Sequence, residues 1–85
     1  MNRHVLREQL ATIEHERWAS WQRYLHDQCV RNPDGSLTIP AALVARWERQ
    51  IATPYGQLSE PEKNADRAQV ARYFHLVEAG CGGEE

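Results

Sequence analysis

The first 29 residues constrain the fold more than any other part of the chain, because they contain neither glycine nor proline. The segment Asn2–Cys29 is rich in residues that favour helix, which predicts one helix about 40 Å long. Apolar side chains recur along one broad face of this helix, at Leu6, Leu10, Ile13, Trp21, Tyr24 and Leu25. A helix of that length is long for a domain of 85 residues.

The remainder of the chain contains signals for a turn and two further helices. Asn32–Gly35 has the composition of a turn, and the alternating segment Ser36–Ile39 is expected to be extended. Pro40 opens a second helix that stops at Thr53, before a proline. The third helix starts at a capping box and runs to about Ala79, ending at a glycine. We predict an all-α fold, a small three-helix bundle with a short extended or turn segment between helices 1 and 2.

Length and apolar spacing also predict how the chain is organised. A chain of this size forms one domain, which we place at residues 1–79, followed by a flexible C-terminal tail at residues 80–85. The aromatic residues Trp21, Trp47 and Phe74 lie centrally on three separate apolar faces, so we expect them to meet in one core. Cys29 and Cys81 are expected to be free thiols.

Composition and sequence pattern argue against bulk nucleic acid as a partner, against a membrane span and against secretion. The formal net charge is −2, and no clustered basic face predicts binding to bulk nucleic acid. No apolar run approaches the roughly 18 residues that a membrane span requires. The N-terminus lacks the pattern of a signal peptide, so a cytoplasmic location is expected.

No motif predicts an enzyme, a cofactor or a metal site. The segment His15–Ala19 begins like a zinc-protease helix, but Ala19 occupies the place of the second histidine ligand. The chain has no nucleophile elbow and no glycine-rich phosphate loop, and neither cysteine lies in an activating motif.

A set of charged and aromatic residues forms the candidate binding site. Lys63 and Arg67 are like charges one turn apart near the positive end of the third helix, which is unfavourable unless an anion lies between them. In one interpretation the anion is a protein carboxylate, with Glu14 or Glu16 and Asp66 neutralising the cations. In the other, the set lines a pocket for a small anionic ligand. The candidate residues are His15, Arg17, Trp18, Tyr55, Lys63, Asp66 and Arg67.

Most of these residues carry a family resemblance. The first block is His15-Glu16-x-Trp18, and the second is Pro54-Tyr55-x-x-Leu58-Ser59-Glu60-x-Glu62-Lys63-x-x-Asp66-Arg67. In this order they resemble the RyR domain, over roughly residues 8 to 78. The Gly-Trp-x-Tyr-Gly segment usual between the two blocks is absent, and the chain is more similar to short stand-alone phage or prophage versions than to receptor repeats.

The resemblance implies a mostly helical, non-catalytic binding module of phage or prophage origin, acting in the host cytoplasm. Its expected target is a small anionic, nucleotide-like ligand. The alternative is a protein-interaction module, such as a phage inhibitor of a host defence factor, in which the charged set is purely structural. The identity of the ligand or host partner and the oligomeric state stay open at this point.

Overall fold

The computed structural model describes residues 2–83 of the chain. Helix α1 spans Arg3–Gln28, and Asn2 caps it: the Asn2 Oδ1 atom accepts hydrogen bonds from the backbone N–H groups of His4, at 2.7 Å, and Val5, at 3.4 Å. Such a cap satisfies donors that have no partner within the helix. With no glycine or proline to interrupt it, α1 continues for 26 residues.

A small hairpin joins α1 to the next helix. Strands β1 (Val30–Arg31) and β2 (Leu37–Thr38) pair antiparallel, with Val30 opposite Thr38. The turn between them closes through a 3.0 Å hydrogen bond from the Gly35 N–H to the carbonyl of Asn32. Gly35 has a φ of 90°, a conformation that glycine adopts without steric cost. The predicted turn and extended segment are therefore confirmed, and β1 is the partner strand that the sequence pattern did not indicate.

Two helices complete the chain. Helix α2 spans Ala41–Ala52, the short 3-10 helix η1 spans Tyr55–Gln57, and helix α3 spans Glu60–Gly83. The predicted fold class is confirmed, with three helices and a short extended segment between the first two. Helix α3 continues past the expected end near Ala79 as far as Gly83. Residues 84–85 of the predicted tail lie outside the described residues. No helix in the range 2–83 combines the length and apolar character needed to cross a membrane.

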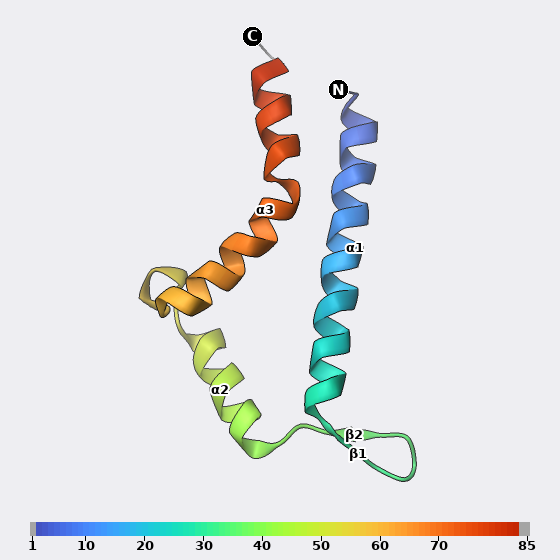
Figure 1. The fold of residues 1–85 in the computed structure, drawn as a ribbon, viewed down its shortest axis with the longest axis vertical. Helices are drawn as coiled ribbons and strands as arrows, with labels where there is room; N and C mark the ends of the chain where they lie inside the picture. The colour runs from blue at the N-terminus through green and yellow to red at the C-terminus, as the bar shows by residue number, and fades with distance from the viewer. Residues whose placement is uncertain (1, 84–85) are drawn as a thin grey trace.

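The helices lie beside one another in one layer. Seen down the shortest axis of the molecule, the C-terminal half of α3 runs along the N-terminal half of α1, and α2 joins the far end of α3 (Figure 1). The molecule measures 55 × 33 × 16 Å, and its Cα radius of gyration is 17.2 Å. A compact domain of this length has a radius of gyration of about 12 Å. The three-helix arrangement is therefore open and flat.

The predicted aromatic core forms only in part. The Trp21 and Trp47 rings meet edge to face, with centroids 5.6 Å apart, and this contact links α1 to α2. The prediction was wrong for Phe74, whose side chain is 50% exposed on α3. Among the described residues only Leu76 is buried. The apolar stripes were identified on each helix, but the chain does not cover them all by itself.

Candidate functional site

The start of α3 is built by the predicted capping box. The Ser59 N–H and Oγ–H both donate to Glu62 Oε1, at 3.1 and 2.8 Å, and Ser59 Oγ accepts from the Glu62 N–H at 3.4 Å. Arg49 of α2 donates to the other Glu62 oxygen at 3.2 Å. The Ser59 hydrogen bonds, followed by Arg49, lower the pKa of Glu62 below its ordinary value of 4.5. The cap therefore also ties α2 to α3.

Lys63 and Arg67 share one protein carboxylate. Lys63 Nζ lies 3.9 Å from Glu60 Oε1, and Arg67 Nη1 donates to Glu60 Oε2 at 3.1 Å. The Lys63 ammonium also lies 5.8 Å from the centroid of the Tyr55 ring. The hydrogen bond to Glu60 raises the pKa of Arg67 above its ordinary value. The anion between the two cations is thus Glu60, rather than Glu14, Glu16 or Asp66.

The remaining site candidates lie on or next to α1. The His15 and Trp18 rings stack with centroids 6.0 Å apart, one turn apart on the same helix. Within residues 2–83, no hydrogen bond, ion pair or aromatic contact joins this pair to Tyr55, Lys63 or Arg67. Trp18 is 52% exposed. The structure therefore places this pair apart from the cations at the start of α3.

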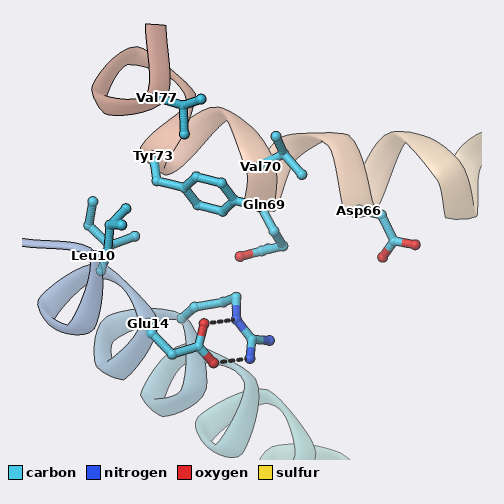
Figure 2. Close-up of a pocket in the computed structure, with 9 residues that line it drawn as sticks. Leu10, Glu14, Asp66, Gln69, Val70, Tyr73 and Val77 are labelled. Atoms are coloured by element: carbon cyan, nitrogen blue, oxygen red, sulfur yellow. Dashed lines mark hydrogen bonds and ion pairs between the residues drawn. The ribbon is translucent and has the colours of Figure 1, made fainter. Parts of the chain in front are cut away.

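Arg17 and Asp66 face the groove between α1 and α3. Figure 2 shows Asp66 and Gln69 pointing from α3 towards α1, where two hydrogen bonds join Arg17 to Glu14, one of them 2.9 Å long. These hydrogen bonds lower the pKa of Glu14. Gln69 Oε1 is buried and has no hydrogen-bond partner among the described residues. The groove has a volume of about 520 Å³, and its lining is mostly apolar: Leu10, Ile13, Val70, Tyr73 and Val77, with Glu14, Arg17, Asp66 and Gln69.

The seven predicted site residues therefore fall into three groups. Tyr55, Lys63 and Arg67 gather at the start of α3, His15 and Trp18 stack on α1, and Arg17 and Asp66 line the groove. The helical spacing identified the side of each helix on which a residue lies. It did not indicate the distances between residues that lie on different helices.

A second feature, which we call the apolar hollow, lies beside the Trp21–Trp47 contact. It has a volume of about 450 Å³, and apart from Gln50 and Asp66 its lining residues are apolar: Trp21, Leu25, Ile39, Trp47, Ile51 and Leu58. Ile51 lies one turn after Trp47 on the same apolar face of α2, yet it is 78% exposed. The apolar spacing of helix 2 predicts a face that packs against the rest of the chain, and it does not reveal that part of this face stays open.

Within residues 2–83, no group of three or more His, Cys, Asp or Glu side chains lies close enough to hold an ion. Cys29 is a half-buried free thiol, and the side chain of Cys81 lies outside the described part of the structure.

Comparison of the chain with protein-family models, with curated proteins and with solved structures finds no match.

Proposed function

We propose that this chain is a non-catalytic protein-interaction module that binds protein through the large side chains of Trp18, Trp21, Ile51 and Phe74, which are left open on its three helices. The observation that carries the proposal is the exposed area. The accessible surface is 6746 Å² for a chain of 9.8 kDa. A folded monomer of that mass exposes about 5,200 Å², so roughly 1,600 Å² remains that a compact domain would cover.

The chemistry of this surface is that of a protein interface. Large apolar side chains, Trp18, Trp21, Ile51 and Phe74 among them, are more than 40% exposed. Aromatic residues are enriched at the centres of protein interfaces and supply much of their binding free energy. Large exposed apolar patches mark interaction sites in soluble proteins. The resemblance to the RyR domain, which implies a binding role without catalysis, is consistent with this proposal.

The proposal is tested by crosslinking in cells that express the chain. A double variant, Ile51→Glu with Phe74→Glu, places charges on the open apolar surface at two well-exposed positions. The control, Val5→Glu with Val30→Glu, adds the same charges at exposed apolar positions on the first turn of α1 and on β1.

We expect the parent and the control to be recovered in crosslinked protein complexes, and the double variant to be recovered as the free chain with unchanged helix content. Recovery of the parent as the free chain would overturn the proposal.

A small anionic, nucleotide-like ligand is the second candidate, and one observation favours it. Lys63 and Arg67 converge on Glu60, whose side chain is 69% exposed, so a phosphate group could take the place of that carboxylate beside Tyr55. Exposed ion pairs of this kind are weak and easily exchanged.

A thermal-shift measurement with ATP and with inorganic pyrophosphate tests this candidate. A ligand at 100 times its Kd stabilises the native state by about 2.7 kcal/mol. We expect Glu60→Gln to increase the shift and Arg67→Met to abolish it. If neither compound raises the melting temperature of the parent, the candidate fails.

A further inference from the structure

The apolar hollow lies where a compact domain would have its core. Residues from α1, from the segment after β2, from α2 and from the segment before α3 all meet there. Apart from Gln50 and Asp66 the lining side chains are apolar, as core residues are, yet Ile51 among them is 78% exposed. The elements gather around this point, but no element of residues 2–83 closes it.

The single layer of helices explains why the hollow stays open. Domains are built from at least two packed layers, because a helix buries its apolar stripe only against another element. Here α3 runs along α1 with its C-terminal half and α2 joins the far end of α3, so the helices form one layer with no further element of residues 2–83 stacked on it (Figure 1). Among residues 2–83, no element supplies a second layer.

We infer that a second copy of this chain supplies that layer and covers the apolar hollow in a two-fold symmetric dimer. This inference rests on the proposed function, and it identifies another copy of the chain as a protein that the interaction surface binds. Two copies that each cover roughly 1,600 Å² would bury about 3,200 Å² in total. That area lies within the 2,000–5,000 Å² of obligate homodimers and exceeds the standard interface of about 1,600 Å².

The shape and charge of the surface fit a copy of itself. A two-fold interface is self-complementary, so a group that projects from one copy can enter the hollow of the other, and the reverse contact forms at the same time. Ile51 projects beside a hollow of about 450 Å³, which is large enough to receive an isoleucine side chain. Asp66 is the sole charged residue lining the hollow, and a formal net charge of −2 on each chain produces little repulsion between copies.

The test is the mass of the purified chain in solution, measured by light scattering after size exclusion and by sedimentation equilibrium up to about 100 µM. We expect a species of twice the 9.8 kDa chain mass. Ile51→Glu should raise the dimer dissociation constant at least 100-fold, because it brings a charge into the covered hollow. Val5→Glu, an equivalent change at another exposed apolar position, should leave the constant unchanged.

Folding and assembly are separated by two further measurements. Ile51→Ala removes apolar atoms without adding charge. It should raise the dimer dissociation constant about tenfold, and the variant should have the same helix content as the parent. The melting temperature of the parent should rise with protein concentration, as it does for a dimer and not for a monomer. The concentration series remains decisive if Ile51→Glu does not fold.

A parent chain that is monomeric at 100 µM, with a melting temperature independent of concentration, would overturn the dimer. So would equal dimer affinity in Ile51→Glu and Val5→Glu. If the chain is monomeric in solution but is recovered in complexes with another protein in cells, the dimer is wrong and the proposed function is retained. A chain that is free both in solution and in cells would overturn both.

Discussion

At the scale of single residues, Glu60 determines what Lys63 and Arg67 do in the free protein. Both cations contact this one exposed carboxylate, so no buried charge is left unpaired when either cation is removed. We expect Lys63→Met and Arg67→Met each to keep the melting temperature within about 5 °C of the parent, because ion pairs to an exposed carboxylate such as Glu60 contribute little. Differential scanning calorimetry checks this. A steep loss in both variants would indicate a buried network, which the geometry contradicts.

Glu62 gives the protein a predictable response to acid. Its pKa is lowered by Ser59 and then by Arg49, so the folded state binds a proton less readily than the unfolded state. This contribution to stability is present above the ordinary value of 4.5 and is lost as the pH falls through the lower pKa of the folded state. We expect urea titrations between pH 6 and pH 3 to show a smaller loss of stability for Glu62→Gln than for the parent. An equal loss in both would indicate that other carboxylates cause the acid sensitivity, such as Glu14 and Asp34, whose pKa values are lowered by hydrogen bonds from Arg17 and Ser36 respectively.

At the scale of elements, α2 depends on two side-chain contacts. Trp47 packs against Trp21, and Arg49 pairs with Glu62. A helix of 12 residues is marginal in water without tertiary packing. In Trp47→Ala we expect the amide protons of residues 41–52 to exchange at least tenfold faster, while those of α1 change less. Hydrogen exchange followed by mass spectrometry measures this, with Trp18→Ala as the control. Unchanged protection of α2 would show that the Trp21 contact does not hold this helix.

At the scale of the whole molecule, the open layer has a measurable size. If Ile51→Glu is monomeric and folded, small-angle scattering should give a radius of gyration near the Cα value of 17.2 Å. A compact three-helix domain of 85 residues would give about 12 Å. Scattering from a urea-unfolded sample provides the upper limit for comparison. A value near 12 Å would mean that the free chain closes its own hollow, which would remove the need for a second layer.

Local features of the structure could be predicted because their partners lie close in sequence. Ser59 and Glu62 are three residues apart, and Gly35 and Asn32 close a four-residue turn, so spacing and residue type were sufficient. The Trp21–Trp47 contact followed from two apolar stripes. Phe74 and Ile51 also lie on apolar stripes, but the spacing of a stripe does not reveal whether its residues are buried within the same chain. Glu60 was missed because Glu14, Glu16 and Asp66 were assigned to the cations, although Glu60 lies only three residues before Lys63.

The near absence of buried side chains has a consequence for mutational tolerance. In a compact domain, the positions that resist substitution are those buried within the chain. Here only Leu76 among the described residues is buried, so burial within one chain distinguishes few positions. A scan of all single substitutions would therefore produce a map of the surfaces that are covered by another molecule. Intolerant positions clustered around the apolar hollow would outline that molecule's footprint before the complex itself had been isolated.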